Sequence, residues 1–343
     1  MEPSSDPAMQ VFECVRNMWA TRSLATVASL KIPDVLRDGP LRAHEIAAQL
    51  DLDRDSVFRL MRAVSSMGFF EHTQGDVFAL TASGEYLLSD VPGSMRSYLV
   101  AMCAPGHWLP WGNLEHTVRT GTPSTEMELG ADLGSYYTKH PDEGHLFNDA
   151  MSNVFAISSA ICLEVFPFED LVTDDMTVVD VGGAHGDFLG EVLTRLNRPD
   201  TIRGVLFDLP HVVNEAAEFG NLSLDIDCVP GDFFDSVPPG DLYLLKHVLH
   251  EWDDASCTTI LRNLRAAMPA TGRVLIVEIV LEETSDSPLA ATSAMLDINT
   301  MVMFRGRERT EAEYANLLAD AQMNLVKLIR TSTPFSIIEA VAA

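Results

Sequence analysis

Along the second half of the chain, short apolar runs alternate with segments of helical periodicity. The runs are rich in Val, Ile and Leu and are bounded by Gly, Pro and Asp, as in strands buried on both faces of a parallel sheet. This order predicts an α/β fold with a mostly parallel sheet between two layers of helices, and a ligand over the carboxyl ends of the strands. The expected strands are residues 177–181, 204–208, 224–229, 242–246, 274–280 and 336–341.

The start of the chain follows a helical pattern instead. Residues 8–32 carry apolar side chains at helical spacing, Trp19 among them, and so much apolar surface at a chain end predicts packing against a second subunit. Residues 43–50 and 54–67 form a helix-turn-helix pattern, and a hairpin signal at residues 69–80 completes a winged helix.

A helical stretch rich in large apolar side chains lies between these two parts. Stripes of aromatic and Met residues, such as Trp108, Phe147 and Met151, are more often core than pocket. The pattern therefore predicts three regions: a helical winged-helix domain at residues 1–100, a helical linker at residues 101–170 and a Rossmann-like domain at residues 171–343.

Composition and charge exclude several classes of function. The 343 residues carry a formal net charge of −27, which disfavours nucleic acid and anionic membrane surfaces as partners. Residues 41–90 hold four Arg and no Lys against eight Asp and Glu, so we do not expect the winged helix to bind DNA. No apolar run approaches the ~20 residues of a membrane span. The five cysteines form no Cys-x-x-Cys pair, which predicts reduced thiols in the cytoplasm and no zinc site.

One strand–turn–helix segment predicts a ligand site. The buried run at residues 176–181 ends in a glycine turn, where a ligand can approach the backbone closely and the first amides of the next helix favour an anionic group. The dinucleotide fingerprint Gly-x-Gly-x-x-Gly is not met, because Ala184 and Asp187 stand at its second and third glycine positions counted from Gly182. Asp180 before the turn repels a diphosphate and favours a cationic cofactor. S-adenosyl-L-methionine, with its sulfonium, ammonium, carboxylate and ribose, fits this pattern.

Four further motifs follow in order along the chain. They are Val229-Pro-Gly-Asp-Phe-Phe234, Gly240-Asp-Leu-Tyr-Leu-Leu-Lys-His-Val-Leu-His-Glu-Trp-Asp-Asp254, Val274-Leu-Ile-Val-Glu-Ile-Val-Leu281 and Gly306-Arg-Glu-Arg-Thr-Glu311. Together with the glycine turn, they resemble the S-adenosylmethionine-dependent O-methyltransferases that include the plant caffeate and flavonoid enzymes and bacterial antibiotic-tailoring enzymes. The resemblance covers nearly the whole chain. It implies a class I methyltransferase domain of Rossmann-like fold behind a winged-helix domain that mediates homodimerisation and covers the partner's active site.

The resemblance also implies a set of cofactor-binding residues at the strand ends. Asp208 would accept hydrogen bonds from both ribose hydroxyls, as expected of an acid that ends the second strand of a doubly wound sheet. Asp232 would bind the adenine amino group, Phe233 would cover the adenine face, and Lys246 would lie near the methionine end. The expected cofactor-binding residues are Gly182, Asp208, Leu209, Asp232, Phe233 and Lys246.

The expected reaction moves a methyl group from the sulfonium to a phenol oxygen and leaves S-adenosyl-L-homocysteine, with no metal. A phenol titrates near ~10 and a histidine near ~6.5, so complete proton transfer between them is uphill by roughly 5 kcal/mol unless the proton leaves as the new bond forms. By resemblance, His250 is the general base, and Glu278 and Glu308 flank its ring and hold its tautomer. His247 precedes the Leu-His-Glu-Trp match, and we interpret it as structural.

By resemblance, the substrate is a flat hydroxylated aromatic molecule. The acidity of the chain favours a neutral or cationic substrate over a polyanion. Asp297 either contacts the substrate or caps and pairs with a neighbour such as Arg305. The expected substrate-facing residues are Trp108, Phe147, Met151, Asp297 and Met301.

Three other functions stay open at this point. The first is a catalytically altered relative that keeps the cofactor as a structural or regulatory ligand. A second is a winged-helix regulator that senses the nucleoside. N-methylation is the third, because an amine acceptor needs less help from a base.

Overall fold

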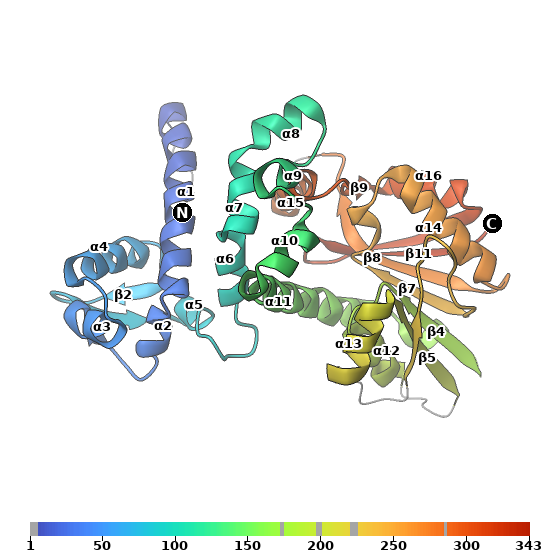
Figure 1. Cartoon of the computed structure of the whole chain (residues 1–343), viewed down its shortest axis with the longest axis horizontal. Helices are drawn as coiled ribbons and strands as arrows, with labels where there is room; N and C mark the ends of the chain where they lie inside the picture. Colours follow the sequence, from blue (N-terminus) through green and yellow to red (C-terminus); the bar gives the residue numbers. More distant parts are fainter. Residues whose placement is uncertain (1–5, 172–174, 197–200, 220–225, 285–286) are drawn as a thin grey trace. The chain divides into compact units, whose positions relative to one another are not determined.

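The computed structural model describes residues 6–171, 175–196, 201–219, 226–284 and 287–343, which fold into two compact units (Figure 1). Unit 1 comprises Met1–Gly112 and Glu126–Phe155, and unit 2 comprises Asn113–Thr125 and Ala156–Ala343. The segment of residues 101–170, predicted as a linker, contributes to both units.

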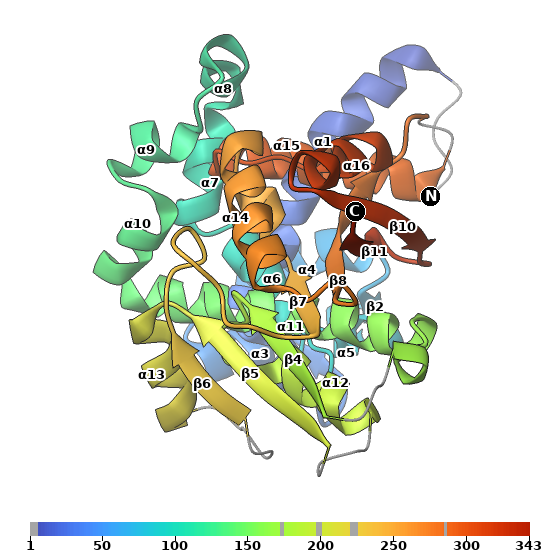
Figure 2. The ribbon, with the colours of Figure 1, turned by 90° about the vertical axis from the view of Figure 1, so that its right-hand side faces the viewer.

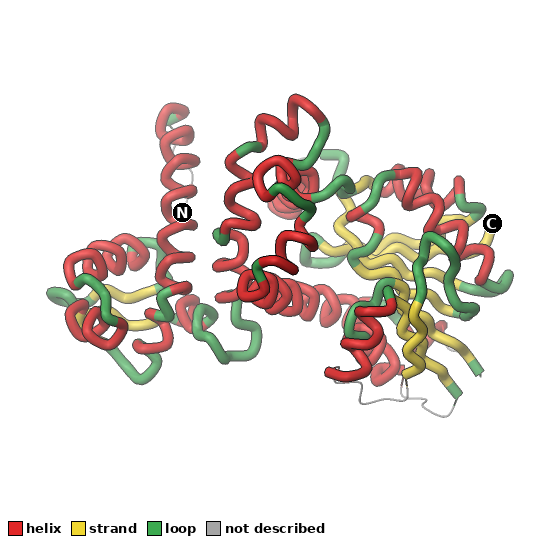
Figure 3. Tube along the Cα trace, viewed as in Figure 1, coloured by secondary structure: helices red, strands yellow, loops and turns green. Residues whose placement is uncertain are grey.

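Unit 1 is mostly helical and contains the predicted winged helix (Figure 3). The second helix of the motif begins at Asp53, whose carboxylate accepts the Ser56 N–H at 2.9 Å and so satisfies one of the free amides of the first turn. The helix-turn-helix consists of α3 (Ala43–Leu50) and α4 (Arg54–Ser65). The wing is an antiparallel sheet of order β1-β3-β2, made of β1 (Leu41–Arg42), β2 (Phe70–His72) and β3 (Val77–Leu80).

Only the C-terminal half of the first helix, α1 (Pro7–Ser29), packs into the core of unit 1. The helix begins with Asp6 as the N-cap and a proline at its first position, which both favour a helix start. Near its C-terminus, Leu24 and Val27 pack into the winged-helix core. The apolar side chains of its first half stay exposed: Met9, Val11, Phe12, Val15, Met18 and Trp19. This is the surface predicted to face a second subunit.

Short helices and one long helix complete the chain before the large sheet. The long helix, α11 (Pro141–Val165), has the length and composition of a membrane span, so the prediction that no segment approaches one is wrong on this criterion. The core helix of a soluble protein passes the same test. The other elements are α2 (Ile32–Val35), α5 (Ala82–Glu85), α6 (Arg96–Met102), α7 (Pro105–Gly112), α8 (Leu114–Thr120), α9 (Ser124–Leu129), α10 (Leu133–Lys139) and the 3₁₀ turn η1 (Phe168–Leu171).

Unit 2 is built on a sheet whose strands follow the order β10-β11-β8-β7-β4-β5-β6. The five strands from β8 to β6 are parallel, and β11 and β10 add an antiparallel pair at one edge. The predicted mostly parallel α/β sheet is therefore confirmed; residues 224 and 225 of one predicted strand lie outside the described residues. The strands are β4 (Met176–Val181), β5 (Ile202–Asp208), β6 (Ile226–Pro230), β7 (Leu242–Lys246), β8 (Arg273–Leu281), β9 (Arg309–Thr310), which pairs with β8, β10 (Met323–Arg330) and β11 (Phe335–Ala342).

Alternate residues of the strands point to opposite faces of the sheet and so build two cores. Val179 and its neighbours pack with α14 and α16, whereas Val178 and its neighbours pack with α12, and Figures 1 and 2 show these helices on opposite faces. The helices of unit 2 are α12 (Asp187–Leu196), α13 (Pro210–Phe219), α14 (Asp254–Ala267), α15 (Pro288–Met303) and α16 (Glu311–Asp320).

The sequence pattern missed the edge strand β10. Its face away from the core is exposed and carries polar residues such as Asn324 and Lys327, so it lacks the continuous apolar run of the central strands. A half-exposed edge strand is typical of an antiparallel pair.

Candidate active site

The glycine turn after β4 adopts a left-handed backbone. Gly182 and Gly186 have φ values of +71° and +79°, and Ala184 between them has φ +51°, which is uncommon for a residue with a side chain. A Cβ on Gly183 would lie 2.6 Å from the carboxyl group of Asp180, so no side chain fits there. The turn is therefore shaped by backbone and leaves its outer surface open to a ligand.

Asp180 lies beneath this turn rather than facing outward. Its side chain is buried, its Oδ2 has no hydrogen-bond partner among the described residues, and burial raises its pKa to about 7. Lys246 at the end of β7 is a charged neighbour whose own pKa is lowered by burial, with Nζ 5.5 Å from the Phe188 ring centroid. That Asp180 favours a cationic cofactor stays a prediction; the structure shows that its carboxyl group lies beneath the turn and does not face outward.

The structure joins the other expected cofactor residues to the turn. The Asp208 carboxylate, at the end of β5, accepts the Ala184 N–H at 2.9 Å through Oδ2 and the Leu209 N–H at 2.7 Å through Oδ1. Each carboxylate oxygen has a second lone pair that stays available to a hydroxyl donor. A Cβ on Gly182 would lie 3.7 Å from the Phe233 ring, so this aromatic face borders the turn.

Two of the expected cofactor residues are solvent-exposed at this edge. Asp232 accepts the Phe234 N–H at 2.8 Å through Oδ1, and Leu209 follows Asp208 into solvent. Open glycine backbone, a carboxylate with free lone pairs and an aromatic face are the groups that a nucleoside requires, so the residues present fit the expected cofactor.

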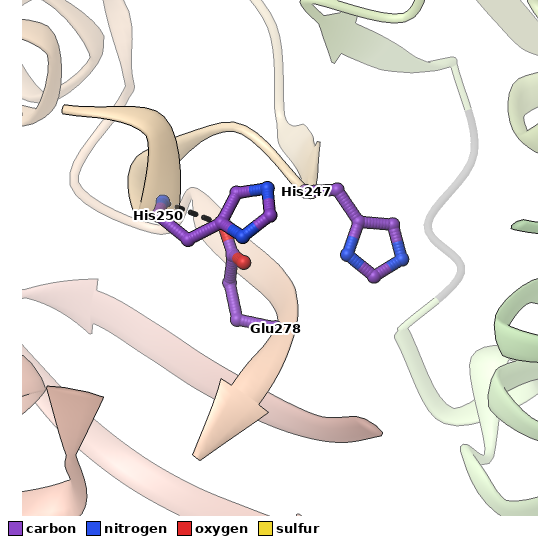
Figure 4. Close-up of side chains that lie close together, drawn as sticks. All are labelled: His247, His250 and Glu278. Carbon is purple, nitrogen blue, oxygen red and sulfur yellow. Dashed lines mark hydrogen bonds between the residues drawn. The ribbon is translucent and has the colours of Figure 1, made fainter. Parts of the chain in front are cut away.

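A short 3₁₀ turn, η2 (Leu249–Glu251), carries His250 at the same edge of the sheet. Its backbone amides point to Glu278 of β8, which is fully buried. Glu278 Oε1 accepts the N–H groups of Val248 at 3.0 Å, Leu249 at 2.8 Å and His250 at 3.4 Å, the last drawn in Figure 4. Such convergence of amides on one carboxylate oxygen fixes the turn against β8.

Glu308 is the carboxylate that contacts the imidazole. Its Oε1 lies 2.9 Å from His250 Nδ1 and also accepts the Thr300 hydroxyl at 3.1 Å, while Asp297 Oδ1 accepts the Glu308 N–H at 2.9 Å. The prediction that both glutamates hold the ring is therefore wrong for Glu278, whose hydrogen bonds within the described residues go to the backbone of the turn. A proton on Nδ1 shared with Glu308 leaves Nε2 for a second partner.

These carboxylates change the basicity of His250. Burial lowers the pKa of His250, but the negative charges of Glu278 and Glu308 outweigh burial and raise it to about 10. Burial also raises the pKa of Glu278. One oxygen of each glutamate, Oε2, has no hydrogen-bond partner within the described part of the chain.

His247 is buried on the other side of this turn. It has φ +57°, its Nε2 lies 3.0 Å from the Ser158 hydroxyl, and it packs on the Phe335 ring. Burial holds the pKa of His247 well below its ordinary value, so the ring is neutral. His247, His250 and Glu278 offer ligand atoms within 4.8 Å of one another, a spacing that also suits a metal ion (Figure 4).

The expected substrate-facing residues divide between the two units. Trp108 packs under the Arg22 guanidinium at 5.4 Å, and the Phe147 ring stacks on His107 and on Tyr137 at centroid distances of 5.5 and 4.9 Å, all within unit 1. Met151, half-buried, also belongs to unit 1, while Asp297 and the half-buried Met301 lie on α15 in unit 2. Asp297 binds the Glu308 backbone, which agrees with the expected capping of a neighbour.

Three residues of the His250 surroundings were not expected from the sequence. The Thr300 hydroxyl donates to Glu308 Oε1, the same oxygen that contacts the imidazole. Gly306 lies against the His250 carbonyl, and Arg309 binds the carbonyls of the same turn. The sequence did contain a signal for two of them, because Gly306 and Arg309 belong to the same Gly-Arg-Glu-Arg-Thr motif as Glu308.

Curated relatives match the chain over most of its length. Phenazine O-methyltransferase PhzM of Lysobacter antibioticus is 33% identical over 334 residues, which are 96% of this chain and 95% of that protein. O-demethylpuromycin-O-methyltransferase of Streptomyces alboniger is 36% identical over 322 residues, 91% of this chain and 83% of that protein.

Solved structures of the same architecture include both O- and N-methylating enzymes. A methyltransferase of calicheamicin biosynthesis, in its SAH-bound form, superposes with a TM-score of 0.85 at 29% identity over 99% of this chain and 100% of that chain. The N,N-8-amino-8-demethyl-D-riboflavin dimethyltransferase from Streptomyces davawensis superposes with a TM-score of 0.81 at 29% identity over 98% of this chain and 100% of that chain.

Family models account for both parts of the chain. The O-methyltransferase dimerisation domain matches residues 12–90, and the O-methyltransferase domain matches residues 111–323. The second match contains all of α11, which identifies this apolar helix as part of the O-methyltransferase domain. The chain therefore belongs to the class I S-adenosylmethionine-dependent O-methyltransferases that carry the family's dimerisation domain in front of the O-methyltransferase domain.

Proposed function

We propose that this enzyme methylates a hydroxyl group of an aromatic small molecule in natural-product biosynthesis, with His250 as the general base and S-adenosyl-L-methionine as the methyl donor. The observation that carries the proposal is the 2.9 Å contact between His250 Nδ1 and Glu308 Oε1 at the strand edge that also holds Asp208 and the glycine turn. The relatives named above act on a phenazine and on O-demethylpuromycin.

The raised pKa of His250 makes the imidazole a stronger base, but it also keeps the ring protonated near neutral pH, so this proton has to leave before the ring can accept one from the acceptor. When bound, the cofactor supplies an electrophilic methyl group, and the protein has to remove the acceptor proton. With a pKa of about 10, His250 matches the ~10 of a phenol, so the proton transfer that would be uphill by roughly 5 kcal/mol for an ordinary histidine becomes nearly balanced. The phenol and the imidazole then bind a proton with nearly equal affinity. In the reactive state one of their two protons has been lost, and this state becomes more populated as the pH rises toward 10.

Asp208 and Phe233 are the residues that we propose for the nucleoside. The lone pairs left on the Asp208 carboxylate can accept both ribose hydroxyls, and the Phe233 ring beside Gly182 offers a stacking face for the adenine. Gly182, Leu209, Asp232 and Lys246 surround them at the same strand edge.

Two substitutions separate the base from the cofactor site. His250→Ala should abolish turnover and leave the affinity for S-adenosyl-L-homocysteine, measured by calorimetry, nearly unchanged. Asp208→Ala should weaken that affinity first. The exposed His211 and Asp227 supply matched controls, and His211→Ala and Asp227→Ala should behave as the wild type. Loss of cofactor affinity in His250→Ala would reassign His250 to the cofactor site.

N-methylation is the second candidate, favoured by the structural similarity to the riboflavin-related dimethyltransferase. An amine acceptor carries its own lone pair and depends less on a base. A panel of phenols and aromatic amines, assayed by release of S-adenosyl-L-homocysteine, decides between the two. Activity on amines that survives His250→Ala would favour N-methylation.

We also propose that the enzyme is a cytoplasmic homodimer that binds no nucleic acid. The exposed apolar side chains of α1 and the match to a dimerisation domain support self-association. All five cysteines are free thiols, which suits a reducing compartment. The charge of −27 disfavours nucleic acid. Sedimentation, cell fractionation and a gel shift at low salt test these three statements.

A further inference from the structure

Arg309 is a fully buried arginine beside the turn that carries His250. A guanidinium has five N–H donors, and here each of them has an acceptor. Nε and one Nη2 hydrogen go to Asp254 Oδ1 at 3.0 and 2.8 Å. Nη1 donates to the carbonyls of Leu249 at 3.0 Å and Arg307 at 3.3 Å, and Nη2 also donates to the carbonyl of Trp252 at 2.7 Å. Two of the five bonds therefore hold the main chain on either side of His250.

The turn is held from both of its polar sides by neighbouring strands. Glu278 on β8 accepts its N–H groups, and Arg309 on β9 donates to its carbonyls. The two strands are paired in parallel, with Val280 opposite Arg309, so the acceptor and the donor are fixed relative to each other. The turn itself is a single 3₁₀ turn whose own bonds include the Trp252 N–H to the Leu249 carbonyl at 3.2 Å. A segment this short depends on outside partners for its position.

Arg309 also connects the turn to Glu308, because the two residues are adjacent in the chain. Glu308 bonds to His250 Nδ1, and Arg309, the next residue along the chain, bonds to the backbone that carries the ring. A displacement of the turn would therefore change the geometry between His250 and Glu308 directly. The Asp254 carboxylate, at the start of α14, keeps the guanidinium plane in register with the two carbonyls.

We propose that Arg309 is a positioning residue for His250, acting through its bonds to the Leu249 and Trp252 carbonyls. The inference rests on the proposed role of His250 as the base. It assigns Arg309 no contact with substrate or cofactor.

Two substitutions of Arg309 test the inference. Arg309→Lys keeps the charge but cannot reach both carbonyls with a planar fork. Arg309→Met removes the charge with little change in side-chain length, and because the Asp254 side chain is 60% exposed, the substitution leaves no buried carboxylate without its partner; the urea midpoint checks that the fold is retained. We expect both to lower kcat on the order of 10²-fold, the effect of moving a catalytic group by about 1 Å. The dissociation constant for S-adenosyl-L-homocysteine should stay within about twofold.

The matched control is Arg262, which also donates to a main-chain carbonyl, that of Asp320, through Nε at 3.2 Å and Nη2 at 3.1 Å. Arg262 lies on α14, and its side-chain hydrogen bonds in the described part of the chain go to Asp320 and not to the η2 turn. Arg262→Lys and Arg262→Met should leave kcat and cofactor affinity at the wild-type values.

A double-mutant cycle with His250→Gln separates positioning from a general structural role. Single turnover with a radiolabelled methyl donor keeps the slow residual rate of His250→Gln measurable. If Arg309 acts through His250, Arg309→Met should lower this residual rate by less than about threefold, against the ~10²-fold loss in the wild type. Equal losses in both backgrounds, or an unchanged kcat in Arg309→Met, would overturn the inference. Wild-type turnover in His250→Gln alone would instead overturn the proposed function.

Discussion

Gly306 offers a sharp test of the site because an added methyl group would strike the backbone of the catalytic turn. A Cβ built on Gly306 lies 1.9 Å from the His250 carbonyl oxygen and 2.4 Å from the Glu251 carbonyl carbon. Real Cβ atoms keep at least 3.0 Å from such atoms, so one of the two segments has to move by about 1 Å. Both segments carry site groups, because Gly306 precedes Glu308 by two residues. Gly306→Ala should therefore separate the imidazole from Glu308.

The expected cost of Gly306→Ala has two parts. A shift of about 1 Å in a catalytic group lowers kcat on the order of 10²-fold. Forcing extra volume into a packed site costs about 1–3 kcal/mol of unfolding free energy. The assay is release of S-adenosyl-L-homocysteine with the best acceptor of the panel, together with a urea midpoint and calorimetry with S-adenosyl-L-homocysteine.

Gly190 supplies the control for this experiment. It lies inside α12, and a Cβ there meets nothing within 4 Å. Gly190→Ala should keep full activity and raise the unfolding free energy by about 0.5–1 kcal/mol, because alanine is the better helix former. A Gly306→Ala enzyme with unchanged kcat would show that the turn tolerates the shift, and the reasoning from contact distance to catalysis would be refuted.

Three further predictions concern His250, Thr300 and α1. Because the pKa of His250 is raised to about 10, its ion pair stabilises the fold fully below pH ~6.5 and loses this contribution as the pH rises toward 10. The melting temperature should therefore fall more between pH ~6.5 and pH ~10 in the wild type than in His250→Gln. Thr300→Val removes the hydroxyl bonded to Glu308 and should lower the unfolding free energy by about 1 kcal/mol. The denaturant midpoint measures this loss, and Thr258→Val on α14 is the control. Trp19→Glu puts a charge on the exposed apolar face of α1 and should shift the enzyme toward monomer in sedimentation, and an unchanged dimer would place the interface elsewhere.

The sequence was most informative where one physical rule dominates. The central strands are buried on both faces and read as apolar runs, so β4, β5, β7 and β8 were predicted within one or two residues. The winged helix was predicted equally well, because Gly68 and Asp53 mark its turns. In both cases local pattern and tertiary environment agree.

Prediction from sequence was less complete for contacts made through the backbone. Glu278 was expected to touch the imidazole, but it binds three main-chain amides, and no side-chain pattern reveals such a partner. Asp297 and Arg309 likewise bind main-chain groups of residues far from them in the sequence. The burial of Asp180 under the turn was not predicted either, because it depends on how closely Gly183 approaches the carboxyl group.

The residues that hold His250 all belong to unit 2, whereas Trp108, Phe147 and Met151 belong to unit 1. Under the proposed function, the expected acceptor contacts of unit 1 are therefore separate in the chain from the residues that hold His250, although Asp297 and Met301 of unit 2 are also expected to face the acceptor. A library restricted to Trp108, Phe147 and Met151 would test this division, because every member keeps the same surroundings of His250. Engineering of this enzyme toward another phenol should begin in that region and leave the Gly-Arg-Glu-Arg-Thr segment untouched.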